Sequence, residues 1–143
     1  MDQQTYFTFS MKFGDVQSAH AVDPHAIELS KLLNTFCNKS YSPHLDRFAP
    51  EARVDGKRWK WGFEGCEHVL LDAEQRCITI RIGVPESRWL DKSSEEIRGY
   101  LFNQFEQALR LMVEKIKTEK LIVDDSKLFE DFSIVKEKYL YTS

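Results

Sequence analysis

The 143-residue sequence is poor in the residues that mark several specialised classes of protein. Its three cysteines, Cys37, Cys66 and Cys77, are an odd number without a CxxC pair, so a disulfide framework is not expected. No stretch approaches the ~18 uncharged apolar residues of a membrane span. The N-terminus, MDQQTYFTF, lacks the basic and apolar regions of a secretory signal. These absences predict a cytoplasmic protein that makes no contact with a membrane.

A large excess of charge of one sign is also missing. Lys and Arg number 20 against 23 Asp and Glu, which gives a formal net charge of −3. This near balance argues against a general nucleic-acid coat protein or a polybasic membrane binder. Hydrophobic residues make up 42% of the chain and aromatic residues 13%, a composition that can bury a core. The length predicts a single domain over residues 1–143.

The common chemical motifs are absent as well. The sequence contains no GxxxxGK[ST], GxGxxG or HExxH pattern. A zinc site needs three or four converging ligands, and the four scattered histidines do not predict one. We therefore expect no metal, no cofactor and no enzymatic activity. One alternative stays open, because Cys66 and His68 share strand parity and a pocket that also held an acid would suit a Cys/His nucleophile.

Secondary-structure signals begin with alternation of apolar and polar residues in TYFTFSMKF, which predicts a strand over 5–13. Asp23 and Pro24 resemble a helix N-cap and first position, and the apolar stripe behind them predicts a helix over about 24–38. Residues 39–52 carry two prolines and are expected to be the least regular part of the chain.

The middle of the chain predicts strands joined by tight turns. Asp55-Gly56 is a two-residue hairpin signal leading into KRWKWGF, where Trp59 and Trp61 share one face and are expected to fill the core. Two further strands, 66–71 and 76–82, flank the turn 72–75. The second should point Ile78, Ile80 and Ile82 inward.

The long helix gives the clearest signal. Ser93 and Glu96 form a capping box, and apolar residues recur behind them every three or four positions, which predicts a helix over about 94–119. Residues 128–141 suit either a helix or a strand. Together these elements predict an α+β fold: an antiparallel sheet of four or five strands packed by one short and one long helix, in the order β-α-β-β-β-α.

Two charged stretches are candidates for partner binding. The acids Glu64, Glu67, Asp72 and Glu74 lie in residues 62–75, which contain no Lys or Arg. They form either a solvated turn or an acidic patch complementary to a basic partner. Directly before them, Arg58 and Lys60 interleave with Trp59 and Trp61. That pattern also occurs in platforms for single-stranded nucleic acid, although the cations and rings take opposite faces.

In the order of these elements the sequence resembles the immunity proteins of bacterial polymorphic toxins, including those of contact-dependent growth inhibition systems. The resemblance lies in four segments: YFTFSMKF, KRWKWGF, ITIRIGVP running into SSEEIRGYLFNQFEQALRLM, and DSKLFEDFSIVKEKY. It implies a non-catalytic protein that binds and neutralises a cognate toxin domain, often a nuclease, inside the producing cell. We expect Glu64, Glu67, Asp72 and Glu74 to face the toxin, with Arg58 and Lys60 beside them.

Two other kinds of binding protein remain open from the sequence. A secretion chaperone is also small, acidic and α+β, and it would bind an extended effector segment, often as a dimer. A small nucleic-acid-binding domain would use the KRWKW segment and lose affinity steeply with salt. The sequence does not predict an oligomeric state.

Overall fold

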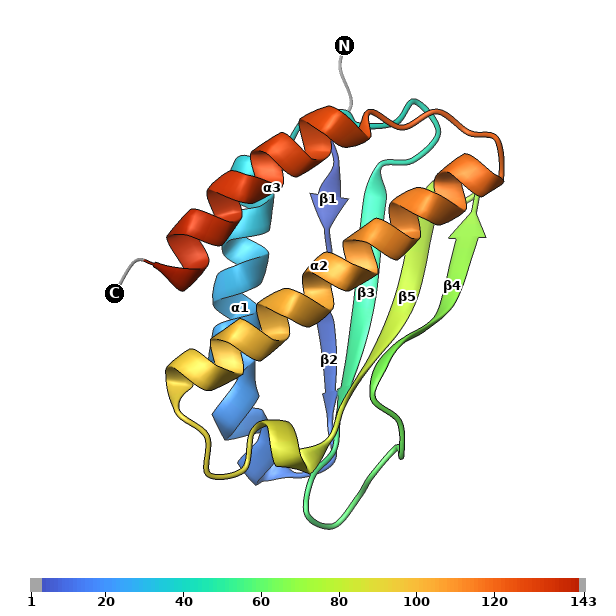
Figure 1. The fold of residues 1–143 in the computed structure, drawn as a ribbon. Helices are drawn as coiled ribbons and strands as arrows, with labels where there is room; N and C mark the ends of the chain where they lie inside the picture. The colour runs from blue at the N-terminus through green and yellow to red at the C-terminus, as the bar shows by residue number, and fades with distance from the viewer. Residues whose placement is uncertain (1–3, 142–143) are drawn as a thin grey trace.

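The computed structural model describes residues 4–141, which form a mixed β-sheet with three α-helices on one of its faces (Figure 1). The strands are β1 (Tyr6–Phe7), β2 (Ser10–Phe13), β3 (Arg47–Val54), β4 (Gly65–Asp72) and β5 (Cys77–Val84). The helices are α1 (Val16–Phe36), the short 3-10 helix η1 (Glu86–Arg88), α2 (Ser94–Thr118) and α3 (Asp125–Leu140). The expected α+β class is confirmed, and the sheet has five strands where four or five were expected. The expected order with one short and one long helix was wrong, because the first strand is divided in two, α1 is 21 residues long and a third helix, α3, follows α2.

The direction of the strands differs from the prediction. The sheet has the order β1-β3-β5-β4, with β2 also paired to β3. Strands β1, β2 and β5 all run parallel to β3, and β4 alone runs antiparallel to its neighbour β5. The prediction of an antiparallel sheet was wrong because β5 returns between β3 and β4. The strands joined by residues 55–64 are therefore not neighbours, and Asp55-Gly56 does not form a two-residue hairpin.

The strand predicted within KRWKWGF is found earlier in the chain, before this loop. Residues 47–54 form β3, mostly within the segment 39–52 that was expected to be irregular, whereas residues 57–63 form no strand. Pro50 lies in the middle of β3, at the level where β1 ends and β2 has not begun. The Thr8 N–H donates a hydrogen bond to the Phe48 carbonyl. Two residues further along β3, Pro50 has no N–H with which to continue the ladder. This explains why the predicted strand 5–13 is split in two.

Helix α2 begins where the sequence predicts it, whereas helix α1 does not. Helix α2 begins at Ser94, and the Ser93–Glu96 capping box is present, as predicted. Helix α1 begins at Val16 instead of Pro24, because Asp15 is its N-cap and Pro24 lies inside the helix. The ambiguous segment 128–141 falls largely within α3.

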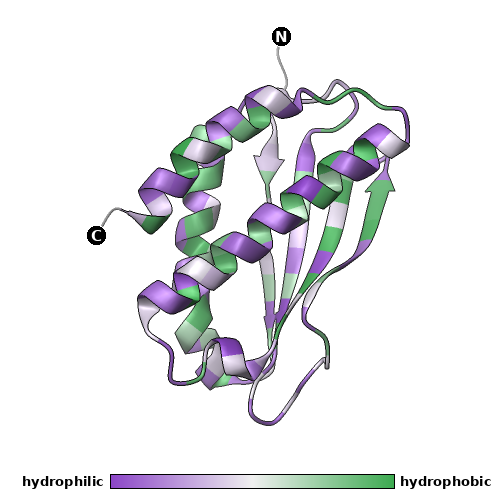
Figure 2. Cartoon of the chain, in the orientation of Figure 1, coloured by the Kyte–Doolittle hydropathy of each residue, from purple (hydrophilic) through white to green (hydrophobic). Residues whose placement is uncertain are grey.

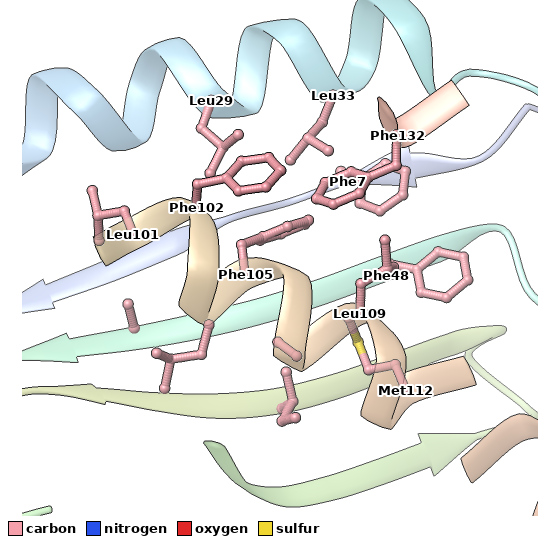
Figure 3. Close-up of a cluster of buried hydrophobic side chains, with 14 of the residues drawn as sticks. Phe7, Leu29, Leu33, Phe48, Leu101, Phe102, Phe105, Leu109, Met112 and Phe132 are labelled. Atoms are coloured by element: carbon pink, nitrogen blue, oxygen red, sulfur yellow. The ribbon is translucent and has the colours of Figure 1, made fainter. Parts of the chain in front are cut away.

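Aromatic side chains at the centre of the core join the sheet to α2 and α3, and Leu29 and Leu33 of α1 belong to the same cluster (Figure 3). Phe105 of α2 lies between Phe7 of β1, at 6.2 Å between ring centroids, and Phe132 of α3, at 5.8 Å. Phe7 also stacks on Phe48 at 5.3 Å. The inward-facing Ile78, Ile80 and Ile82 of β5 are buried, as predicted. Hydrophobic and hydrophilic bands alternate along α2 and α3 (Figure 2). Each of these helices therefore buries its apolar side and exposes the other.

Candidate partner-binding surface

Residues 55–64 form a loop that projects beyond the end of the sheet (Figure 1). The loop is fixed to the start of α1 by Asp15. One carboxylate oxygen, Oδ1, accepts the Ser18 N–H at 2.8 Å and caps the helix, while Oδ2 accepts the Lys57 N–H at 2.7 Å. The Ser18 bond above all, with further bonds from the loop backbone, outweighs desolvation and holds the pKa of Asp15 below its ordinary value. The carboxylate therefore couples the loop to the helix.

Glycine permits the close approach of the two segments. A Cβ on Gly14 would lie 2.3 Å from both Gly56 N and Trp59 O, and a Cβ on Gly56 would lie 2.6 Å from Asp15 Cγ. Neither contact is compatible with a larger residue unless the backbone moves. The loop consequently packs against the turn before α1 through its own main chain.

Asp55 holds the inner side of the same loop. Its Oδ1 accepts the Trp61 N–H at 2.7 Å, and its main-chain carbonyl accepts Trp89 Nε1–H, also at 2.7 Å. Trp89 is buried in the core, so this bond connects the loop to the interior of the molecule. At the far end, Phe63 lies over Gly83 of β5, where a Cβ would meet Phe63 O at 2.3 Å. The loop is thus attached at three separate places.

The loop presents an aromatic ring and two cations. Trp59 is 59% exposed and meets Trp61 edge-on, with 6.4 Å between ring centroids. The expectation that Trp59 fills the core was wrong, because residues 57–63 form a loop and not a strand of the sheet. Lys57 and Arg58 are exposed, and within residues 4–141 neither side chain makes an ion pair. We call Val16, Lys57, Arg58 and Trp59 the loop-tip surface.

Beside these side chains the surface is hollowed. The hollow has a volume of about 370 Å³ and is lined by Asp15, Val16, Gln17, Lys57 and Arg58. Val16 is 69% exposed although it is apolar. Lys60 takes a different role from its neighbours, because its Nζ reaches Glu86 at 3.6 Å and donates to the Gly56 carbonyl at 3.2 Å. Of the two cations expected at the site, Arg58 is available to a partner and Lys60 has partners within the chain.

The four candidate acids are spread along β4 and do not form one cluster. Glu64 precedes the strand and Asp72 ends it, so at roughly 3.3 Å per residue they are separated by at most about 26 Å. Glu67 lies between them, opposite Arg81 of β5, with an oxygen 3.6 Å from His68 Nε2. Asp72 accepts the Gln75 N–H at 3.1 Å and Glu74 lies exposed in the turn. We call Glu67, Leu70, Asp72 and Glu74 the β4 edge.

The Glu64 carboxylate already has an ion-pair partner and a hydrogen-bond donor within the chain. Its Oε2 lies 2.6 Å from Arg88 Nε and accepts the Tyr100 hydroxyl at 2.7 Å. The Arg88 guanidinium, and after it the Tyr100 hydroxyl, hold the pKa of Glu64 below its ordinary value. The acids of the β4 edge are thus more available to a partner than Glu64 is.

The Cys66 and His68 pair is not assembled as a nucleophile. A β-bulge separates Glu67 from Leu70, and His68 has a φ of 56°, so the simple alternation of faces fails there. The Cys66 thiol points to α2, with its Sγ 3.7 Å from the Gln104 carbonyl, while His68 is exposed beside Glu67. Burial raises the pKa of Cys66 to about 11, which opposes formation of a thiolate.

Within residues 4–141, no group of three or more His, Cys, Asp or Glu side chains is placed so that it could hold a metal ion. Nor does any helix among residues 4–141 have the length and apolar character needed to span a bilayer.

Part of the surface was not anticipated from the sequence. Asp15 was missed because Asp23-Pro24 offered a second plausible helix start eight residues later. The signal was nonetheless present: an acid three residues before Ser18 completes a capping box, in which Ser18 Oγ accepts the Asp15 N–H at 3.2 Å. Trp59 was recognised as part of a motif but assigned to the interior.

The fold and this surface define a small α+β domain with an anchored loop that exposes an aromatic ring between charges, a combination typical of proteins that bind other proteins. The comparisons with known proteins agree. The model of the family described as Immunity protein 44 matches residues 5–138, and the chain belongs to that family. Its role is therefore that of an immunity protein, which neutralises a toxin. No curated protein and no solved structure matches the chain.

Proposed function

We propose that this chain neutralises one cognate bacterial toxin domain by binding it stoichiometrically, without catalysis. The observation that carries the proposal is the family match over residues 5–138. The protonated, helix-facing Cys66 thiol also favours binding over covalent chemistry. The binding takes place in the cytoplasm of the cell that produces the toxin, in a system of the contact-dependent growth inhibition type.

The binding side of the molecule is the one that carries the loop-tip surface and the β4 edge. The loop 55–64 leads directly into β4, which is an edge strand of the sheet. Arg58 marks the cationic end of this side, and Asp72 and Glu74 mark the acidic end beyond the strand. Leu70, which is 65% exposed, adds apolar area between them. In this arrangement Glu67 contributes to the contact, whereas Glu64 and Lys60 position the loop.

The acidic end of the β4 edge suits a toxin of a particular chemistry. Nucleases carry basic surfaces because they bind phosphates, and Asp72 and Glu74 would oppose such a surface. We therefore propose a nuclease as the toxin. Acids on an edge strand also prevent strands of two molecules from pairing, so the β4 acids have a second, structural explanation.

The test begins with capture from the source cells. The tagged chain is used as bait at ~150 mM salt, at which exposed charges more than about 8 Å apart are screened. The captured protein is identified, and its gene is expressed alone and together with this chain. The proposal predicts a one-to-one partner that stops growth when expressed alone and permits growth when this chain is present. A captured protein that is harmless alone contradicts the proposal.

Charge reversal tests the assignment of the acids. In a variant with Glu67, Asp72 and Glu74 all changed to Lys, association with the toxin should slow and become less sensitive to salt. If the variant instead binds unchanged and forms dimers, the acids act only as protection of the edge. Degradation of DNA or RNA by the isolated toxin would support the nuclease assignment, whereas intact nucleic acid would contradict it.

A further inference from the structure

We propose that the loop-tip surface is the anchor of the toxin complex: Trp59 packs into an apolar recess of the toxin, and Lys57 and Arg58 pair with carboxylates around that recess. This inference rests on the proposed function and adds the part of the chain that carries most of the affinity. It also states the chemistry of the surface that the toxin presents there, an apolar recess with an acidic rim.

The first argument is that the loop is already held in one conformation. Asp15 accepts the Lys57 N–H, Asp55 accepts the Trp61 N–H, and the Gly56 N–H donates to the Trp59 carbonyl at 2.8 Å. These bonds fix the main chain on both sides of Trp59. A side chain on such a segment loses little conformational entropy when it is buried in a complex.

The second argument is the type of residue that is exposed. Tryptophan and arginine are enriched among the few residues that dominate protein interfaces, and here they are adjacent in sequence. Trp59 is a large aromatic side chain of the loop that remains mostly exposed, while Trp61, which meets it edge-on, is half-buried. Exposed Val16 extends the apolar area at the hollow beside Lys57 and Arg58.

The third argument is charge complementarity. Lys57 and Arg58 bring two positive charges to the loop tip, and the nearby Asp15 carboxylate is directed at main-chain N–H groups of Ser18 and Lys57. The chain as a whole has a net charge of −3, so this local excess of positive charge is not a property of the entire surface. An acidic rim on the toxin would balance these two cations.

The opposite charge lies at the other end of β4, where Asp72 ends the strand and Glu74 lies in the turn that follows. The toxin would then meet cations at the loop tip and acids at the turn after β4. Such a two-ended pattern favours one orientation of the partner over the reverse, because the reverse places like charges together.

Nucleic acid fits this surface less well than a protein does. Platforms for single strands stack successive bases on several rings and follow the phosphates with a basic groove. Here one ring is mostly exposed, two cations sit at a single point, and the strand that leaves the loop carries acids. We therefore commit to a protein partner and treat nucleic acid as an outcome of the test.

The experiment uses the full chain and the purified toxin domain identified by capture and growth arrest. Dissociation constants are measured for the wild type, Trp59→Ala and the double variant Lys57→Glu, Arg58→Glu. We expect Trp59→Ala to weaken binding about 30-fold or more, the effect of a residue central to an interface. The double variant should weaken binding about tenfold or more and slow association.

Matched controls come from exposed residues elsewhere on the chain. Tyr6→Ala removes an exposed aromatic from β1, and Lys136→Glu reverses an exposed charge on α3. Both should bind within about twofold of the wild type, and all variants should melt within a few degrees of it. Restoration of binding to the double variant by an acid-to-lysine change in the toxin would identify the paired carboxylates.

Two results would overturn the inference. The first is binding of Trp59→Ala and of the double variant at wild-type strength, which would leave the proposed function intact. The second is wild-type binding to a labelled oligothymidylate at ~150 mM salt that is lost in Trp59→Ala, which would assign the loop to nucleic acid. Failure to find any toxin partner, in contrast, would refute the proposed function itself.

Discussion

The main-chain N–H of Lys57 donates a 2.7 Å hydrogen bond to Asp15, whose other carboxylate oxygen caps α1. Forty-two residues separate the two in sequence. One side chain therefore determines both where the first long helix begins and how the exposed loop 55–64 is held. This connection joins the exposed loop to the first turn of α1.

Substitution of Asp15 separates its two roles. Asparagine caps helices well, so Asp15→Asn should keep the cap at Ser18, but its amide cannot accept at both positions. We expect faster hydrogen exchange at the Lys57 amide with little change in α1. Asp15→Ala should lose both roles and lower the melting temperature by roughly 3–6 °C. Unchanged exchange in Asp15→Asn would mean that the loop is held by its other contacts.

Glycine substitutions test the close packing under the loop. Gly14→Ala and Gly56→Ala each place a methyl group within 2.6 Å of atoms of the opposite segment, and we expect each to cost about 1–3 kcal/mol of unfolding free energy. The control is Gly99→Ala in α2, where nothing lies within 4 Å of the new methyl group. That change should stabilise the protein by about 0.5–1 kcal/mol. Chemical denaturation measures all three, and equal effects would contradict the packing described here.

A buried polar pair joins the segment after α1 to α3. The Tyr41 hydroxyl donates to Asp131 Oδ2 at 2.6 Å, and both residues are almost fully buried. Tyr41→Phe leaves that carboxylate oxygen without the donor, which should cost about 1–3 kcal/mol. The exposed Tyr6→Phe is the control and should change stability by less than about 0.5 kcal/mol. Denaturant titration would contradict the assignment if the two variants were equally stable.

Acid should destabilise the protein through its hydrogen-bonded carboxylates. The pKa values of Asp15 and Glu64 are lowered in the folded state, by Ser18 and by Arg88 respectively, so the unfolded chain binds protons at these sites more tightly. The stability that they contribute is fully present above the ordinary carboxyl pKa of about 4 and is lost as the pH falls through the lower folded-state pKa. The urea concentration at the midpoint of unfolding should therefore decrease when the pH is lowered below about 4, and the decrease should be smaller in Asp15→Asn. A midpoint that stays constant down to pH 3 would contradict this.

Local signals in the sequence were sufficient for some elements. The Ser93–Glu96 capping box lies within four residues and needs no distant partner, so it located the start of α2. The alternation at Ile78, Ile80 and Ile82 identified the buried face of β5 for the same reason. The turn between β4 and β5 was also correct, because these two strands are neighbours in the sheet as well as in the chain.

Other elements depend on distant partners. Asp55-Gly56 resembles a hairpin, but the insertion of β5 between β3 and β4 is decided by the whole sheet. Pro50 argues against a strand on local grounds, yet it is tolerated where its missing N–H faces the break between β1 and β2. The wrong assignment of Trp59 to the core followed from the wrong prediction of a strand at this segment, because side chains in a loop do not alternate between two faces as they do in a strand. The candidate acids and cations were recognisable by charge, whereas the anchoring by Asp15 requires the folded chain.

The most direct test of the central claim is a titration of the purified toxin with this chain while the toxin's activity is followed. Neutralisation by binding predicts that activity falls linearly and reaches zero at one equivalent, in step with complex formation measured by calorimetry. Complete inactivation by a small fraction of an equivalent would show that the chain acts as an enzyme. Full toxin activity in the presence of excess chain would show that it is not the immunity partner of that toxin.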